Sequence, residues 1–197
     1  MKRSLPLLGV LVLLAAACGG GAHSSAARPT VVRELHLQAD SGQVYIYDPR
    51  TQDEEATEAD NPLTRAMEDG YRSRRFVGYY RGVIDLITPS QRGWRGPMRV
   101  EVSDSAPPLD ADEWDHIVEV PLSAPSGRLF FAPSGGGTPV ETSIPPGRYR
   151  ARLSGRDLVA GQAVGNESYR LQLWPSRDRK PKLVKYWDGY DSVQSAG

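Results

Sequence analysis

The sequence predicts an all-β fold, an antiparallel β-sandwich of roughly eight to ten short strands with one short helix. Three observations support this. Glycine and proline are frequent, with 20 and 16 copies in 197 residues, and they separate short segments rich in β-branched and aromatic residues. Turn signals recur at intervals of roughly 8 to 12 residues. Several segments between the turns alternate apolar and polar residues, which is the pattern of strands that bury one face and expose the other.

The chain is expected to divide into a leader over residues 1–17, a flexible tether over residues 18–30 and one β-sandwich domain over residues 31–197. In the leader, Lys2 and Arg3 precede an apolar run that ends at Ala17. This order of charged, apolar and small residues is typical of a secretory signal peptide. The run is shorter than the roughly 20 residues that a membrane-spanning helix needs. The tether is small, polar and rich in glycine, as flexible linkers are.

Cys18, the only cysteine of the chain, follows the leader directly. The sequence Leu14-Ala15-Ala16-Ala17-Cys18 resembles a bacterial lipobox, the signal for cleavage before a cysteine whose sulfur then receives lipid. We therefore expect a lipid-anchored protein on the extracytoplasmic side of the cell membrane or in the cell envelope. The alternative is an ordinary secretory leader with an incidental cysteine. A single cysteine also excludes a disulfide within the chain and a cysteine nucleophile in the domain.

The first part of the domain is predicted to form a β-hairpin, from strands at residues 32–38 and 43–47 around the turn Asp40-Ser41-Gly42. Residues 48–60 have almost no apolar content and carry an acidic run, so we expect an exposed loop there.

A short helix is predicted over residues 62–69. Asn61 followed by Pro62 is a typical helix start. Apolar side chains then follow at helical spacing, and Gly70 is expected to end the helix.

Strands are expected to dominate the remaining sequence. The alternation is clearest at residues 98–103, where Met98, Val100 and Val102 alternate with Arg99, Glu101 and Ser103. Prolines and glycines bound the other segments. The further predicted strands are at residues 83–87, 115–122, 128–132, 140–144, 148–154, 167–174 and 183–186.

Three short sequences carry a resemblance to a known family: Met67-Glu68-Asp69-Gly70-Tyr71, Glu119-Val120-Pro121-Leu122 and Ile144-Pro145-Pro146-Gly147-Arg148-Tyr149-Arg150. Their order between Glu34 and Pro175 resembles the bacterial family named for competence protein J, an inhibitor of a membrane-associated competence nuclease. Residues 112–119 and 167–175 are also similar to uncharacterised actinobacterial proteins of this shape. The resemblance implies a β-sandwich that acts as an inhibitor or immunity protein toward a nuclease or toxin. The leader with Cys18 and the length of residues 155–166 depart from that family.

One cluster in the sequence has residue types that bind metal ions, namely Asp112, Glu113, Trp114, Asp115 and His116, together with Asp110. Carboxylates and an imidazole are ligands for divalent ions. However, the spacing matches no metal motif, which favours a solvated acidic loop that enters a strand, with Trp114 at the edge of the core. We predict no metal, no cofactor and no catalytic set, and therefore no enzyme.

The charge balance gives no sign of nucleic-acid binding, since the chain has 24 basic and 24 acidic residues. We expect a protein partner. Two surfaces are candidates for the partner. One is the acidic run of Asp53, Glu54, Glu55, Glu58 and Asp60. The other is a basic stripe of Arg148, Arg150 and Arg152, which alternate along one strand and are expected to face water.

The predicted function is therefore that of a membrane-anchored, non-enzymatic binding protein. An alternative is a module of the cell envelope that binds carbohydrate or lipid, with Trp94, Trp114, Trp174 or Trp187 exposed as a stacking platform. A third hypothesis, an unrecognised hydrolase, requires a cleft that gathers acidic side chains from separate strands.

Overall fold

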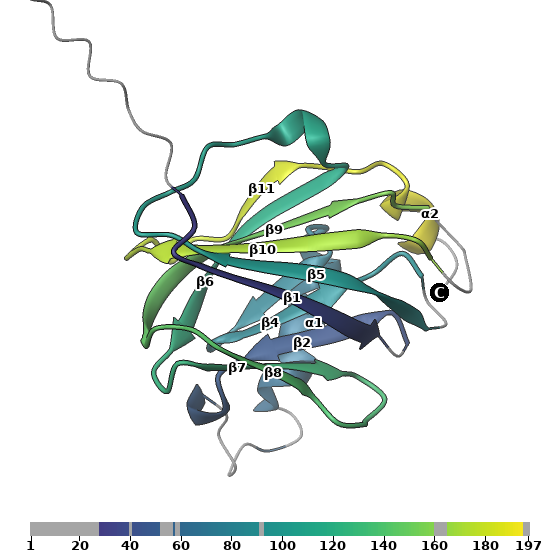
Figure 1. Cartoon of the computed structure of the whole chain (residues 1–197). Coiled ribbons are helices and arrows are strands. Elements are labelled where there is room, and N and C mark those ends of the chain that lie inside the picture. The colour runs from purple at the N-terminus through teal and green to yellow at the C-terminus, as the bar shows by residue number, and fades with distance from the viewer. Residues whose placement is uncertain are drawn as a thin grey trace, which may run out of the picture.

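The computed structural model describes residues 28–39, 41–51, 57, 60–90, 93–159 and 165–194. These residues form two β-sheets packed face to face, so the predicted all-β sandwich is confirmed (Figure 1). No helix in these ranges is long and apolar enough to cross a membrane.

The larger sheet has six strands in the order β1-β5-β10-β9-β6-β11. Neighbouring strands are antiparallel, except that β5 and β10 run parallel. The strands are β1 (Val31–Ala39), β5 (Trp94–Val102), β6 (His116–Ala124), β9 (Gly147–Arg156), β10 (Ser168–Pro175) and β11 (Lys182–Lys185).

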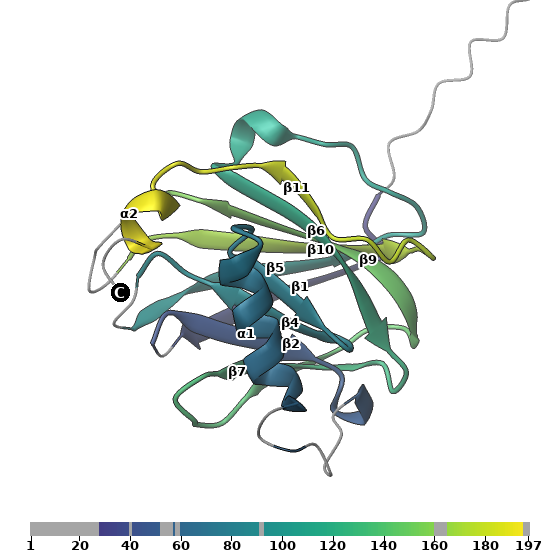
Figure 2. The same cartoon turned by 180° about the vertical axis from the view of Figure 1, so that it is seen from behind.

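The smaller sheet has five antiparallel strands in the order β3-β4-β2-β7-β8. They are β2 (Gln43–Tyr47), β3 (Val77–Tyr80), β4 (Val83–Ile87), β7 (Arg128–Pro133) and β8 (Val140–Ser143). Helix α1 (Pro62–Arg72) lies on the outer face of this sheet, as Figure 2 shows from behind. Two single-turn 3-10 helices, η1 (Pro49–Thr51) and η3 (Ala111–Glu113), and a short helix α2 (Tyr190–Gln194) complete the described elements.

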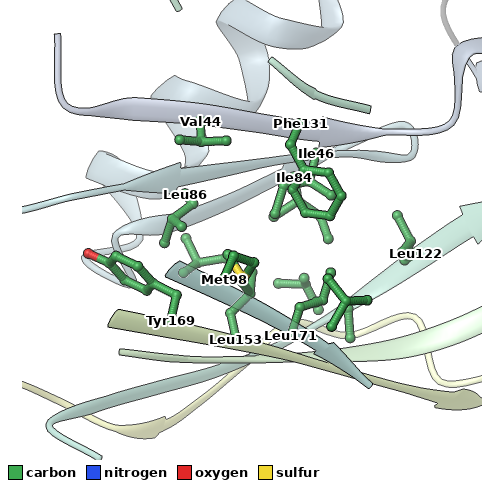
Figure 3. Packing of buried hydrophobic residues seen from close by; sticks show 14 of the residues in the cluster. Val44, Ile46, Ile84, Leu86, Met98, Leu122, Phe131, Leu153, Tyr169 and Leu171 are labelled. Carbon is green, nitrogen blue, oxygen red and sulfur yellow. The ribbon is translucent and has the colours of Figure 1, made fainter. Parts of the chain in front are cut away.

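The core lies between the two sheets, because each strand turns its apolar residues to the same side. Figure 3 shows this packing, with the smaller sheet contributing Val44, Ile46, Ile84, Leu86 and Phe131, and the larger sheet contributing Met98, Leu122, Leu153, Tyr169 and Leu171. All ten side chains are at most 3% exposed. The described core lies entirely within residues 31–190, and no described residue before Val31 contributes to it.

The predicted N-terminal hairpin is wrong. Both strands exist, but β1 pairs with β5 in the larger sheet and β2 pairs with β4 and β7 in the smaller one. Ser41 and Gly42, with φ values of 49° and 71°, carry the chain from one sheet to the other. The turn signal was therefore correct, but the two strands that flank it face each other across the core.

The predicted helix exists, but it does not end at Gly70. It continues to Arg72, and the backbone N–H of Ser73 bonds to the carbonyls of Asp69 and Tyr71. Gly70 is needed for close packing, because a Cβ atom there would lie 3.1 Å from the Gly78 nitrogen and 2.7 Å from Cδ1 of Ile87. The glycine thus lets α1 approach the sheet.

Candidate functional site

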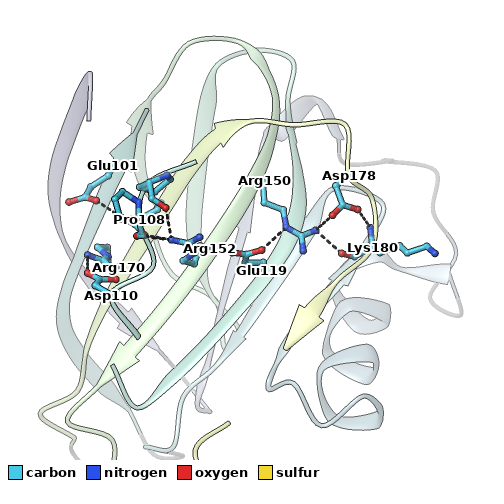
Figure 4. Close-up of polar contacts among 11 residues, drawn as sticks. Glu101, Pro108, Asp110, Glu119, Arg150, Arg152, Arg170, Asp178 and Lys180 are labelled. Atoms are coloured by element: carbon cyan, nitrogen blue, oxygen red, sulfur yellow. Dashed lines mark hydrogen bonds and ion pairs between the residues drawn. The ribbon is translucent and has the colours of Figure 1, made fainter. Parts of the chain in front are cut away.

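A continuous chain of polar contacts crosses the outer face of the larger sheet (Figure 4). It begins on β9, where the residues that alternate with the core residues point outward. Arg152 Nε lies 2.9 Å from Glu119 Oε1, and Arg150 Nε lies 3.2 Å from Glu119 Oε2. Gln172 continues the chain, since its Oε1 is 3.4 Å from Arg152 Nη1 and its Nε2 donates to Glu101 at 2.9 Å.

The chain of contacts ends on β5 and β1, where Arg99 pairs with Glu101 at 2.6 Å and also with Glu34. These contacts thus tie together five neighbouring strands of the larger sheet. Because each charged group has a fixed partner, the side chains on this face are held in defined positions.

The connection between β5 and β6 covers part of this face. The carbonyl oxygens of Pro107 and Pro108 each accept a hydrogen bond from Arg152 Nη1 at 3.2 Å. Farther along, both oxygens of Asp110 bind the Arg170 guanidinium, with Oδ2 at 2.8 Å from Nη1. Burial alone would raise the pKa of Asp110, but the hydrogen bond and charge of Arg170 outweigh it and lower that pKa.

The prediction of a water-facing basic stripe was wrong for two of its three residues. Arg150 and Arg152 are only 3% and 5% exposed. Their charges are compensated by Glu119, and Arg150 is also paired with Asp178 at 3.5 Å. The strand alternation was read correctly, but Pro107 and Pro108 of the β5–β6 connection contact Arg152, and Asp178 and Lys180 after β10 contact Arg150. Arg148, at the start of β9, is exposed as predicted.

Beside the covered region, the face opens into a groove of about 360 Å³, which we call the charged groove. Strands β1, β5, β10 and β9 form its floor, and Glu113 and Trp114 form a wall. The lining residues are Glu34, Pro97, Arg99, Glu113, Trp114, Arg156, Ser168, Tyr169 and Arg170.

Two guanidinium groups lie over the indole of Trp114 in this groove. The Cζ atom of Arg170 is 4.5 Å from the ring centre, and that of Arg156 is 5.3 Å away. Arg170 is held by Asp110, whereas the Arg156 side chain is half exposed and its nearest carboxylate, Asp157, is 3.9 Å away. Arg156 also donates to Ser168 Oγ at 3.0 Å. The groove therefore presents one accessible guanidinium on an aromatic support, a geometry suited to a carboxylate.

The predicted cluster of residues 112–116 does not converge on one point. Asp112 and Glu113 are exposed, while Asp115 accepts a hydrogen bond from the Leu158 N–H at 3.1 Å. His116 is buried, with Nε2 donating to the Arg75 carbonyl at 2.6 Å and Nδ1 accepting from the Trp187 N–H at 3.2 Å. Burial, opposed in part by the Arg75 bond, lowers the pKa of His116 to about 4. No group of three or more potential metal ligands occurs within the described ranges.

Four residues of the predicted acidic run, Asp53, Glu54, Glu55 and Glu58, lie outside the described residues, so their partner role stays a prediction, as does the lipidation of Cys18. Asp60 is described, and its carboxylate accepts from the Tyr80 hydroxyl and pairs with Arg81, each at 2.8 Å.

The tryptophan platform of the alternative hypothesis is contradicted by burial. Trp94, Trp114 and Trp174 are at most 9% exposed, and half-buried Trp187 packs edge-on against Tyr190. The four indoles therefore do not form an exposed stacking surface for a sugar or lipid.

Two carboxyl groups are buried away from these surfaces, and neither oxygen of Asp85 or of Glu167 has a hydrogen-bond partner among the described residues. Asp85 lies on β4, beneath α1 and beside Tyr45. Burial raises the pKa of Asp85 well above its ordinary value. Asp85 belongs to the smaller sheet, whereas Glu167 directly precedes β10 of the larger sheet.

Comparisons with known proteins give likenesses in structure only. No protein-family model matches this chain, and no curated protein matches it in sequence. A solved structure named Crocagin biosynthetic gene J is 19% identical, with a TM-score of 0.47, and the match covers 75% of this chain and 98% of that one. The structure of ComJ, inhibitor of the DNA degrading activity of NucA, from Bacillus subtilis, is 12% identical, with a TM-score of 0.46 and coverage of 76% and 98%. The family that the sequence resembles is thus represented among the similar structures, and the likeness concerns the fold alone.

Proposed function

We propose that this chain is a non-enzymatic binding protein whose charged groove receives a carboxylate-bearing segment of a protein partner. The observation that carries the proposal is the accessible guanidinium of Arg156, which lies over the Trp114 ring in a groove that Arg99 and Arg170 also line. Arginine and tryptophan are enriched among the residues that dominate binding energy at protein interfaces. The floor is built on four hydrogen-bonded strands, so the partner meets a surface that is already ordered.

A protein partner suits this groove because its charges have both signs. Glu34 and Glu113 line the groove together with Arg99 and Arg156. A uniformly anionic polymer would meet these carboxylates, whereas a protein segment can place its own cations opposite them. The finer proposal is that the partner is a nuclease or toxin and that binding neutralises it. Its support is the sequence resemblance to the family of competence protein J.

Charge reversal at Arg156 tests the groove. Arg156→Glu is expected to weaken partner binding by about 30-fold or more, because it removes the accessible cation and repels an incoming carboxylate. The partner is first recovered from envelope membranes with the intact anchored protein, and its affinity is then measured by calorimetry. Its nuclease activity is assayed with and without the domain.

Arg50→Glu is the matched control, since Arg50 is an exposed arginine on η1, outside the groove. It should bind as the unchanged protein does. If the Arg156→Glu and Arg50→Glu variants bound the partner with equal affinity, the partner would not bind in the charged groove. If the partner kept its full nuclease activity at saturating concentrations of the domain, the protein would bind this partner without inhibiting it.

We also propose that a lipid on Cys18 holds the domain at the membrane. Each buried methylene of an acyl chain contributes about 0.8 kcal/mol, so several chains bind firmly. Cys18→Ser is expected to move most of the protein from the membrane fraction to the soluble fraction, and mass spectrometry should find acyl chains only on the unchanged protein. If the unchanged protein were found in the soluble fraction with a free Cys18 thiol, the proposed lipid anchor would be refuted.

A further inference from the structure

Five exposed basic residues gather where β9 begins and β10 ends: Arg148, Arg177, Arg179, Lys180 and Lys182. We call this surface the basic end. Residues 176–185 alone contain five basic residues and one acidic residue, Asp178. That carboxylate is already engaged, since it accepts from the Lys180 N–H at 3.0 Å and pairs with buried Arg150 (Figure 4). Among the ion pairs of the described residues, none involves Arg148, Arg177 or Arg179.

A groove of about 270 Å³ lies within the basic end. Arg148, Arg177 and Arg179 line it together with Tyr79 and Tyr149. It shares no lining residue with the charged groove. Unlike the charged groove, it concentrates charge of one sign, with Asp178 as its one carboxylate, and the half-buried ring of Tyr79 lies beside this charge. Positive charge and aromatic side chains together suit the headgroup region of a lipid surface.

The chain enters the domain at this same end. The Thr30 N–H donates to the Val102 carbonyl at 2.7 Å, and the Ser103 N–H donates to the Leu173 carbonyl at 2.9 Å. Just beyond the end of β10, the Ser176 N–H donates to the Arg148 carbonyl at 3.2 Å. In Figures 1 and 2, the start of β1 and the ends of β9 and β10 that carry Arg148 and Pro175 lie on the same side of the molecule.

We propose that the basic end docks on an anionic phospholipid surface, with lipid phosphates at Arg148, Arg177 and Arg179. The orientation rests on the lipid anchor proposed above, because Cys18 is only 12 residues from Thr30, which lies at this end of the domain. Acyl chains and basic residues are independent contributions to membrane attachment. Docking by this end leaves the charged groove, on the face of the sheet, open to a partner.

Vesicle binding tests the proposal without any acyl chain. A chain that begins at Arg28 keeps the whole described core, and its binding is measured by co-sedimentation at low and high salt. Phosphatidylcholine vesicles with about 30% phosphatidylglycerol are compared with pure phosphatidylcholine. The domain is expected to bind only the anionic vesicles and to lose that binding at high salt.

The double variant Arg177→Glu/Arg179→Glu is expected to bind these vesicles about 30-fold more weakly, since each basic residue near such a surface contributes roughly fivefold. Arg50→Glu/Arg95→Glu makes the same charge change at exposed positions elsewhere and should bind as the unchanged domain does. Equal binding to both vesicle types, no binding at low salt, or equal losses in the two double variants would overturn the proposal. An acidic protein that binds this end while vesicles do not would also overturn it.

The same assay separates this inference from the proposed function. Arg156→Glu should leave vesicle binding unchanged, because Arg156 lines the other groove. Vesicle binding together with no effect of Arg156→Glu on the partner would refute the charged groove and leave the basic end standing.

Discussion

Glu119→Ala is expected to destabilise the protein by about 3–5 kcal/mol, because it leaves two buried guanidinium groups without their shared carboxylate partner. Arg150 and Arg152 both bind the Glu119 carboxylate, and the two arginine side chains are 4% and 6% exposed. Without the carboxylate, Arg152 keeps carbonyl and amide partners and the Trp174 ring, which carry no negative charge. Arg150 keeps the Lys180 carbonyl and the exposed Asp178. The free energy of unfolding is measured by denaturant titration, whose slope should remain unchanged.

Glu141→Ala provides the control, since Glu141 pairs with Arg128 in an exposed ion pair on the smaller sheet. Exposed pairs contribute roughly 0–1 kcal/mol. If Glu119→Ala costs no more than Glu141→Ala, the contacts across the outer face do not stabilise the fold, and the groove floor loses the support that we assign to it.

The unchanged protein is expected to lose stability as the pH rises, because Asp85 must then ionise in a buried position. Asp85→Asn is expected to remove this loss. The folded-state pKa of Asp85 is raised by burial. The contribution of this group is therefore fully present below its unfolded pKa of about 3.9 and is lost as the pH rises toward the folded pKa. Between these two pKa values, the unchanged protein should lose up to about 1.4 kcal/mol per pH unit relative to the variant.

The comparison requires unfolding curves of both proteins from acid to neutral pH. Asp60→Asn should change stability in the opposite sense, because the hydrogen bond from Tyr80, together with Arg81, lowers the pKa of Asp60. Its contribution is present above the unfolded pKa and is lost as the pH falls. Parallel profiles for Asp85→Asn and the unchanged protein would show that Asp85 ionises as freely in the folded protein as in the unfolded chain.

Individual strands could be predicted because alternation and turn residues are local signals. Residues 43–47 and 83–87 were predicted with the observed bounds of β2 and β4. The sheet to which a strand belongs is a nonlocal property. The hairpin prediction failed for this reason, since β1 and β2 adjoin in sequence but pair with β5 and β4. Helix α2 carried too weak a signal, although its Tyr190 is buried, stacks on Phe76 at 4.0 Å and donates to the Ile87 carbonyl at 2.7 Å.

The charged groove could be predicted only in part. Glu113 and Trp114 stood out in the sequence, and both line the groove, as a wall and not as metal ligands. Arg99, Arg156 and Arg170 come from three different strands, and no local pattern joins them. One sequence feature pointed to the burial of Arg150 and Arg152, namely Glu119 within an otherwise apolar strand. In the structure, Glu119 on β6 lies opposite Arg152 on β9. The basic run of residues 177–185 was readable in the sequence, but its position beside the chain entry was not.

The most direct measurement is photo-cross-linking from a single position in the charged groove, with a photoreactive amino acid at Glu113 in the intact anchored protein. We predict that position 113 captures the protein partner and that adding Arg156→Glu abolishes the capture, while the same probe at Arg72, on α1 behind the smaller sheet, captures none. Equal capture from positions 72 and 113, or capture at 113 that persists with Arg156→Glu, would contradict the groove as the binding site.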